Sequence, residues 1–191
     1  MKKVLVINAN PKSNSFCKSL ADQYCASLPS HYATKIIHLG LLDFDSNLQE
    51  GYDQIQPLEA DLVDFQESVR WANHIVIVTP VWWGGLPAKF KGLIDRSFLP
   101  GFAFKYIKDK SIPEKLLEDR TSELIITLDT PVFWYKYVNG NPIYKELKRC
   151  MLGFSGIKNT SATYFGPMIT STKTQRQKWL NHVEKIAKRL K

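Results

Sequence analysis

Cysteine and histidine are scarce in this sequence, and their positions exclude several classes of protein. The three cysteines, Cys17, Cys25 and Cys150, are too few and too scattered for a disulfide framework or a zinc site. This use of cysteine favours a reducing compartment. The four histidines show no metal-ligand spacing, so we expect each at the surface or in a capped position. They are His31, His38, His74 and His182.

Long hydrophobic runs are absent as well. No apolar stretch reaches the roughly 18 residues that suggest a membrane-spanning helix. The apolar run that starts at Val4 has the length of a strand and lacks the cleavage site of a signal peptide. The sequence therefore predicts a protein without a membrane span, and with the cysteine usage it indicates a cytoplasmic location.

The composition is that of an ordinary globular protein. With 191 residues, 44% hydrophobic and 23% charged, the chain is expected to form one domain over residues 1–191 without disulfide or metal staples. Lysine and arginine outnumber acids by 26 to 18, which gives a net charge of +8. The bases are dispersed, with some density over residues 173–191, and a solvated surface is the favoured interpretation. Nucleic-acid binding is disfavoured because no basic cluster accompanies a recognition motif.

Strand-like and helix-like segments alternate along the chain. Continuous apolar runs predict five strands, and amphipathic periodicity predicts the helices between them. The strands are expected at 3–9, 33–39, 74–79, 123–128 and 158–165, and the helices at 14–28, 58–72, 88–98, 141–154 and 173–190. This alternation predicts an α/β fold with a parallel sheet and helices on both faces. Because such sheets bind ligands beyond the carboxyl ends of their strands, loops 10–16, 80–88 and 129–142 are the candidate site.

The first of these loops has the composition of a phosphate site. It carries Asn10, Lys12 and Asn14 and leads directly into a predicted helix. Polar turn residues, a helix N-terminus and a lysine together suit an anion, although an ordinary helix cap would look similar. Neither a Gly-x-Gly-x-x-Gly fingerprint nor a Walker A motif follows the strand. A Rossmann dinucleotide site and a nucleotide hydrolase are therefore disfavoured.

The second loop combines aromatic rings with glycines. Trp82 and Trp83 stand beside Gly84 and Gly85 at the end of a predicted buried strand. Indole rings provide a flat stacking surface, and glycines let backbone N–H groups approach a planar heterocycle. The loop therefore suits a flavin ring. The alternative is one core tryptophan and one surface tryptophan.

The third loop, residues 129–137, is too apolar for an ordinary solvated loop. It is expected to cover a ligand or to form an oligomer contact, with an unrecognised short strand as the alternative. Ser155 does not lie in a Gly-x-Ser-x-Gly elbow, and no general acid–base pair is evident. The absence of a catalytic dyad is consistent with chemistry supplied by a cofactor.

Together these segments resemble the NAD(P)H:quinone oxidoreductase family of flavodoxin-like fold, which includes the modulator-of-drug-activity and potassium-efflux ancillary reductases. The likeness spans most of the chain. Its most specific part is the run Pro-Val-Trp-Trp-Gly-Gly-Leu-Pro-Ala-Lys-Phe-Lys-Gly at 80–92. The other matching segments are 4–16, Ala60-Asp61, 74–79, Asp95-Arg96 and Phe102-Ala103-Phe104.

The resemblance implies a flavodoxin-like, five-stranded parallel sheet in the order 2-1-3-4-5. It also implies a homodimer with flavin near the interface, which uses NAD(P)H to reduce quinones or similar soluble acceptors by ping-pong hydride transfer. The flavin is FAD or FMN, with a slight lean to FAD, and the choice between NADH and NADPH stays open. The expected cofactor-binding residues are Asn10, Lys12, Asn14, Ser15, Phe16, Cys17, Pro80, Val81, Trp82, Trp83, Gly84, Asp129 and Thr130. The first loop would hold the phosphate end, and residues 80–84 the ring.

The sequence departs from the family's pattern after the fourth strand. Many relatives have Thr-Thr-Gly-Gly there, where this chain has Leu128-Asp129-Thr130-Pro131. A carboxylate beside a reduced anionic flavin is unfavourable unless it is protonated or hydrogen-bonded elsewhere. The catalytic tyrosine and histidine of some relatives have no clear match, which leaves Tyr135 and Tyr137 as candidate proton donors to a quinone. An electron carrier of the flavodoxin type, or a non-catalytic flavin protein, is the alternative function.

Overall fold

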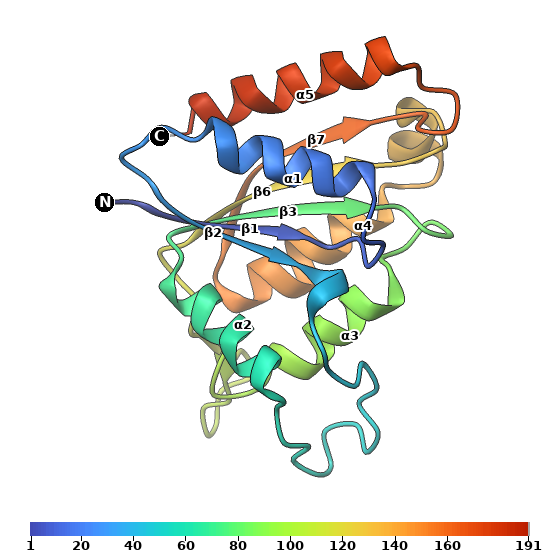
Figure 1. Ribbon diagram of the computed structural model, residues 1–191. Coiled ribbons are helices and arrows are strands. Elements are labelled where there is room, and N and C mark those ends of the chain that lie inside the picture. The colour runs from blue at the N-terminus through green and yellow to red at the C-terminus, as the bar shows by residue number, and fades with distance from the viewer. Residues whose placement is uncertain (191) are drawn as a thin grey trace.

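A single parallel sheet organises the chain in the computed structural model, which describes residues 1–190. Its five strands lie in the order β2-β1-β3-β6-β7 (Figure 1). They are β1 (Lys3–Asn8), β2 (Ala33–His38), β3 (His74–Pro80), β6 (Thr121–Thr127) and β7 (Lys158–Phe165). Numbered among themselves, these strands have the order 2-1-3-4-5, so the predicted flavodoxin-like α/β fold is confirmed.

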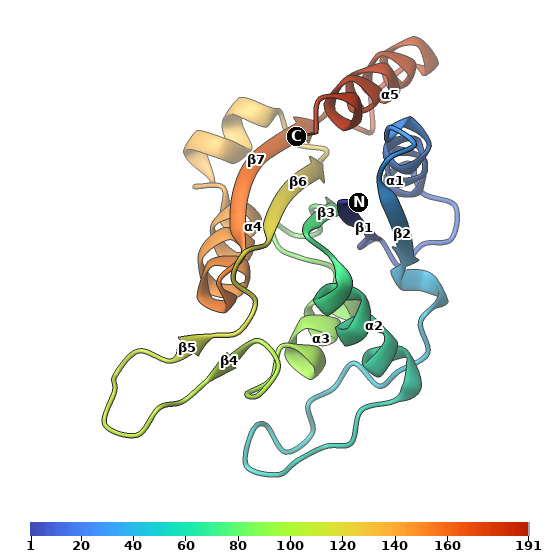
Figure 2. The same cartoon turned by 90° about the vertical axis from the view of Figure 1, so that its left-hand side faces the viewer.

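Helices cover both faces of the sheet (Figures 1 and 2). One face carries α1 (Phe16–Ser27) and α5 (Lys173–Lys188), and the other carries α2 (Ala60–Trp71), α3 (Ala88–Ser97) and α4 (Pro142–Lys145). In β1, Val4 and Val6 join the apolar core under α1 and α5, whereas Leu5 and Ile7 join the opposite core. This period of two explains why a strand buried on both faces is a continuous apolar run in the sequence.

The long connections contain short elements that the sequence did not reveal. A 3-10 turn, η1 (Leu39–Leu41), follows β2, and a small antiparallel pair, β4 (Phe104–Lys105) and β5 (Glu114–Lys115), lies between α3 and β6. The predicted helix at 141–154 is α4 followed by the π-helical segment η3 (Glu146–Gly153). The third candidate loop contains a π-helical turn, η2 (Trp134–Val138), so the alternative of a short strand there is wrong.

One histidine departs from its expected surface or capped position. His74 is the first residue of β3 and is only 1% exposed. Its Nδ1 lies 2.7 Å from Thr121 Oγ1, and its Nε2 lies 3.9 Å from Glu123 Oε2. These partners belong to the neighbouring strand β6, so a polar side chain is accommodated at the start of an otherwise apolar strand.

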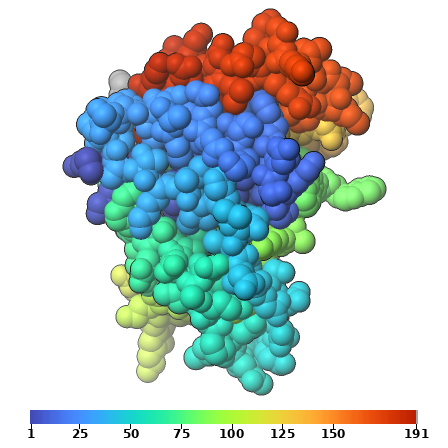
Figure 3. Space-filling model, viewed as in Figure 1, coloured from blue at the N-terminus to red at the C-terminus, as the bar shows by residue number. Residues whose placement is uncertain are grey.

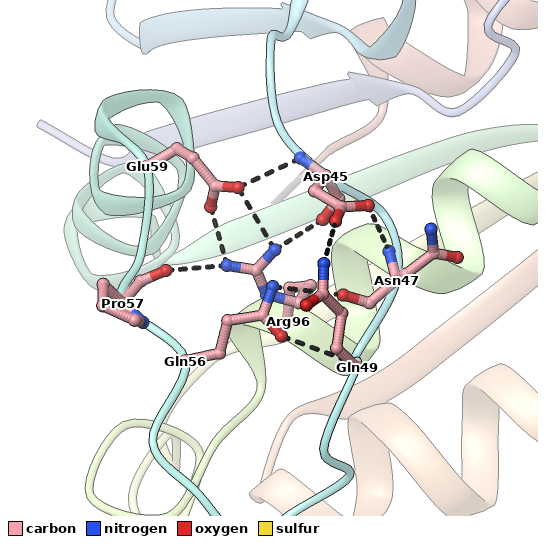
Figure 4. Close-up of polar contacts among 7 residues, drawn as sticks. All are labelled: Asp45, Asn47, Gln49, Gln56, Pro57, Glu59 and Arg96. Atoms are coloured by element: carbon pink, nitrogen blue, oxygen red, sulfur yellow. Dashed lines mark hydrogen bonds and ion pairs between the residues drawn. The ribbon is translucent and has the colours of Figure 1, made fainter.

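A buried arginine fixes the irregular segment between η1 and α2 (Figure 4). Arg96 on α3 is 1% exposed. Its Nη2 donates to Glu59 Oε2 at 2.7 Å and to the Pro57 carbonyl at 2.8 Å, and its Nη1 donates to the Asp45 carbonyl at 2.5 Å. Gly92 on the same helix packs closely on Ser46, where a Cβ would lie only 2.5 Å from the serine Cβ. The hydrogen bonds of the Arg96 guanidinium therefore hold this segment in place, although it has no regular secondary structure.

None of the helices within residues 1–190 combines the length and the apolar character that crossing a bilayer requires.

Replacement of Arg96 by methionine is expected to lower the free energy of unfolding by about 3 kcal/mol, because Glu59 and two carbonyls lose their donor. Urea unfolding followed by circular dichroism measures the change. Lys91→Met is the matched control, since Lys91 forms only a surface pair with Asp95 on the same helix and its loss costs about 0.5 kcal/mol or less. Equal losses in the two variants would contradict the anchoring role of Arg96.

Candidate functional site

The three candidate loops meet around one pocket at the carboxyl ends of β1, β3 and β6 (Figure 1). The pocket has a volume of about 350 Å³. It is lined by Asn10, Lys12, Asn14, Ser15, Phe16, Cys17, Pro80, Val81, Trp82, Thr127, Leu128, Asp129, Met168 and Arg176. The site therefore lies at the switch point between β1 and β3, where open parallel sheets bind their ligands.

The loop after β1 forms one end of this pocket. Asn8 Oδ1 accepts a hydrogen bond from the Asn10 amide at 3.2 Å, and Asn10 Oδ1 accepts one from the Lys12 amide at 3.0 Å. These side chains fold the loop back on itself before Ser15, whose hydroxyl caps α1 by accepting from the Lys18 amide. No acidic residue occupies the first turn of α1. The helix N-terminus therefore favours an anion from outside.

Arg176 adds a cation that sequence reasoning missed. It lies in α5 and lines the pocket together with Lys12. Its Nε donates to Ser171 Oγ at 2.8 Å, and its guanidinium carbon lies 5.7 Å from the centre of the Phe16 ring. Only the general basic density of the C-terminal segment pointed to this residue, because its contact with α1 depends on how the two helices pack. Thr127, Leu128 and Met168 also line the pocket and were not among the predicted site residues.

Cys17 contributes a neutral thiol to the wall of the pocket. Its Sγ lies 3.2 Å from Thr127 Oγ1, at the end of β6. Burial raises the pKa of this thiol despite its hydrogen bonds to Thr127 and Asn10, which act in the opposite direction. Because the thiolate is the reactive form, Cys17 packs and hydrogen-bonds here and is not an activated nucleophile.

The loop after β3 is a tight hairpin turn that projects from the surface (Figures 1 and 3). Trp82 and Gly85 exchange both backbone hydrogen bonds, at 3.0 and 2.9 Å. The two residues between them, Trp83 and Gly84, have φ angles of 51° and 81°, which is the pattern of a type I′ turn. Trp82 lines the pocket, whereas Trp83 extends fully into solvent. Trp83 and Gly84, both predicted site residues, thus lie outside the pocket wall.

Tyr135 supports this turn from the η2 segment. The side chain is 1% exposed, and its hydroxyl donates to the Gly84 carbonyl at 3.2 Å and accepts from the Ile143 amide at 3.3 Å. Tyr137 lies at the surface, 77% exposed. Neither tyrosine lines the pocket, so their catalytic role stays a prediction. The contacts of Tyr135 are those of a residue that positions the turn.

The carboxylate at the end of β6 has a partner outside the pocket. Asp129 lines the pocket, and its Oδ1 accepts a hydrogen bond from the Ile169 amide at 2.8 Å. The condition set by the sequence, a hydrogen bond elsewhere, is thus met for one of its two oxygens. The neighbouring Thr130 is half-buried and does not line the pocket. Within residues 1–190 no group of three or more His, Cys, Asp or Glu side chains could hold a metal ion.

The comparisons with known proteins agree with the fold. A family model described as flavodoxin-like fold matches residues 2–190, so the chain belongs to that family. An uncharacterised NAD(P)H oxidoreductase of Haemophilus influenzae is 27% identical over 172 residues, which cover 85% of this chain and 82% of the relative. Human ribosyldihydronicotinamide dehydrogenase (quinone) is 27% identical over 206 residues, covering 92% and 86%. An FMN-dependent NADH:quinone oxidoreductase of Macrococcus caseolyticus is 29% identical over 149 residues, covering 65% and 68%.

Solved structures show the same architecture. Smu.1420 from Streptococcus mutans superposes with a TM-score of 0.83 at 28% identity, and the match covers 100% of both chains. An NAD(P)H:quinone oxidoreductase from Methanothermobacter marburgensis superposes with a TM-score of 0.81 at 20% identity, covering 97% of this chain and 95% of the other. The second likeness supports the fold alone.

The three thiols are expected to react with iodoacetamide in an order set by burial. Cys150 is exposed and should be modified first near neutral pH, whereas Cys17 should stay unmodified in the folded protein because its pKa is raised. Mass spectrometry of peptides over time measures each rate, and urea-unfolded protein, in which all three should react alike, is the control. Modification of Cys17 as fast as Cys150 would show that the thiol is activated.

Proposed function

We propose that the protein is a flavin-dependent NAD(P)H oxidoreductase that reduces quinones or similar soluble two-electron acceptors. The observation that carries this proposal is the pocket at the switch point, which joins a helix N-terminus with two cations to a tryptophan-containing turn. Membership in the flavodoxin-like family and relatives named as quinone reductases support it.

The phosphate end of the flavin would lie at the N-terminus of α1. Asn10, Asn14 and Ser15 supply polar groups there, the backbone of Phe16 and Cys17 supplies N–H donors, and Lys12 and Arg176 supply positive charge. This donor set fits a phosphate, because charged hydrogen bonds to an oxyanion act together with the helix dipole. The first turn of α1 contains no acidic side chain that would compete with a phosphate for the N-terminal N–H groups.

The ring end would lie along the loop after β3. Pro80, Val81 and Trp82 line the pocket there, and the Val81 amide is bonded to the Thr127 carbonyl at 2.8 Å, which joins this loop to β6. Trp82, which is 45% exposed, offers a stacking face. Trp83 and Gly84 would border the acceptor from outside, while Asp129 and Thr130 would stand at the polar edge of the ring.

When bound, the flavin supplies two-electron hydride transfer in two half-reactions of a ping-pong cycle, first from NAD(P)H and then to the quinone. The chain's own residues bind and orient the reactants. No paired acid and base is needed for that role. Tyr135 positions the turn through Gly84.

FMN is the flavin we propose. The relative from Macrococcus caseolyticus carries FMN in its name, and an NADH:quinone oxidoreductase of Bacillus cereus does so as well. One phosphate cluster at the N-terminus of α1 is what a mononucleotide requires. These names support FMN, and they do not support the lean to FAD that the resemblance suggested.

We also propose that two copies of the chain pair through exposed aromatic surface. Phe133 and Tyr137, which flank or belong to η2, are 63% and 77% exposed. Exposed aromatic side chains are enriched at protein interfaces relative to the rest of the surface. Sedimentation equilibrium should give twice the chain mass, and a monomeric mass would contradict the pairing.

Absorbance of the purified protein tests the proposed reaction. After addition of FMN and removal of oxygen, NADH or NADPH should bleach the flavin bands, and a quinone should restore them. Bands that do not bleach would favour the alternative of an electron carrier. Failure to bind FMN or FAD at all would overturn the proposal.

Arg176→Gln should weaken FMN binding by roughly tenfold, because a charged contact to the phosphate is lost. Lys178→Gln is the matched control, since it removes the same charge from an exposed position of α5 outside the pocket. Titration of FMN against the quenching of its fluorescence compares the two variants. Equal affinities would place the phosphate elsewhere.

A further inference from the structure

A second polar pocket lies at the far end of α5 from the candidate flavin site. Its volume is about 410 Å³, within the range of small-molecule sites. It is lined by Glu123, Ser161, Thr163, His182, Lys185, Ile186, Arg189 and Leu190. Arg176 in the flavin pocket and Arg189 in this one are 13 positions apart, about 20 Å along a helical axis. The proposed flavin chemistry therefore makes no use of this pocket.

One wall of the pocket is a basic stripe of α5. His182, Lys185 and Arg189 are spaced three and then four residues apart, so they share one face of the helix. Among residues 1–190, Lys185 and Arg189 form no ion pair, although like charges four residues apart disfavour a helix. Lys188, just outside the stripe, pairs with Glu184 at 2.5 Å. Lys185 and Arg189 thus present positive charge to the pocket without an ion-pair partner among the described residues.

The opposite wall supplies hydroxyl groups and one carboxylate. Ser161 and Thr163 share a face of the edge strand β7, and Glu123 projects from β6. Glu123 Oε2 accepts from the Tyr24 hydroxyl at 2.9 Å, and Oε1 accepts from the Ser161 hydroxyl at 3.1 Å. Burial raises the pKa of Glu123, but the neighbouring His74 and these hydrogen bonds outweigh it and lower the pKa. Glu123 is therefore a carboxylate near neutral pH.

A buried group behind Glu123 is not fully satisfied. His74 Nε2 lies 3.9 Å from Glu123 Oε2 and has no hydrogen-bond partner among the described residues. Buried polar atoms without a partner are rare. His74 does not line the pocket, so a ligand there would meet Glu123 and not this nitrogen. A bare anion would be repelled by Glu123. A ligand that also brings hydroxyl donors would satisfy both walls of the pocket.

We propose that this pocket binds a small phosphate monoester that carries hydroxyl groups, of the sugar-phosphate class. The phosphate contacts His182, Lys185 and Arg189, and the sugar hydroxyls donate to Glu123 and bond with Thr163. The carboxylate distinguishes such a ligand from nucleic acid, whose continuous phosphates would meet Glu123 as well as the basic stripe. The site is independent of the proposed flavin chemistry.

Ribose 5-phosphate titrated into protein saturated with FMN is the test, since the flavin then occupies the other phosphate site. Backbone amide shifts by NMR report the two pockets separately, so the same titration is informative even if FMN does not bind. The shifts should concentrate on 161–163 and on 182–190, and inorganic phosphate should bind more weakly. Shifts confined to the loop after β1, or equal affinity for both probes, would overturn the proposal.

Lys185→Gln and Arg189→Gln should each weaken the binding of ribose 5-phosphate by roughly tenfold, because each removes a charged hydrogen bond to the phosphate. Lys188→Gln removes the same charge from the same helix outside the pocket and should leave the affinity unchanged. An equal loss of affinity in all three variants would show that binding depends on the net charge of the protein and not on this pocket, and would overturn the proposal. Tighter, steeply salt-dependent binding of a single-stranded oligonucleotide would instead identify a polyanion surface and overturn the proposal.

Discussion

Both faces of the parallel sheet must be buried, and this constraint determines where the chain can hold a ligand. Residues of β1 alternate between two apolar cores, with Val4 under α1 and Leu5 on the opposite side. The chain leaves β1 in one direction, toward β2, and crosses back to place β3 on the other side of β1. The loops after β1 and β3 therefore diverge, and the helix N-terminus of α1 faces the space between them. The strand order therefore determines where the pocket lies, and the side chains that line it determine which ligand it can bind.

The sequence predicts the regular elements well because each carries its own periodicity. All five strands and the helices α1, α2, α3 and α5 lie within about two residues of their predicted bounds. The helix predicted at 141–154 is also present, as α4 and η3, although its π-helical part was not foreseen. The η2 turn and the β4–β5 hairpin were not predictable in this way, because a single turn and two-residue strands are too short to show a period. His74 was misplaced for a different reason: the groups that accommodate it belong to β6, some fifty residues further along the chain.

The residues of the candidate site also fall into two groups, those that the sequence predicts and those that depend on tertiary packing. Residues 10–17 and 80–82 follow their strands directly, so strand prediction alone brought them to one edge of the sheet. Arg176 escaped notice because its contact with Phe16 exists only through the packing of α5 on α1. The same packing places α5 beside two pockets, since its first turn borders the candidate flavin site and its last turns border the polar pocket beside β7. A basic C-terminal helix that looks uniform in sequence is thus divided by the fold into two separate sets of cations.

The turn after β3 shows how the fold supports an unfavourable local geometry. A left-handed backbone at Trp83 costs on the order of 1–3 kcal/mol, and the exposed indole recovers none of it through burial. The paired bonds between Trp82 and Gly85, and the hydroxyl of buried Tyr135 on the Gly84 carbonyl, hold the turn in place. Because η2 supplies Tyr135, the apolar third loop serves the second loop as a brace. Strain maintained by surrounding structure is typical of functional sites, and here it keeps one indole in the pocket wall and a second beside its mouth.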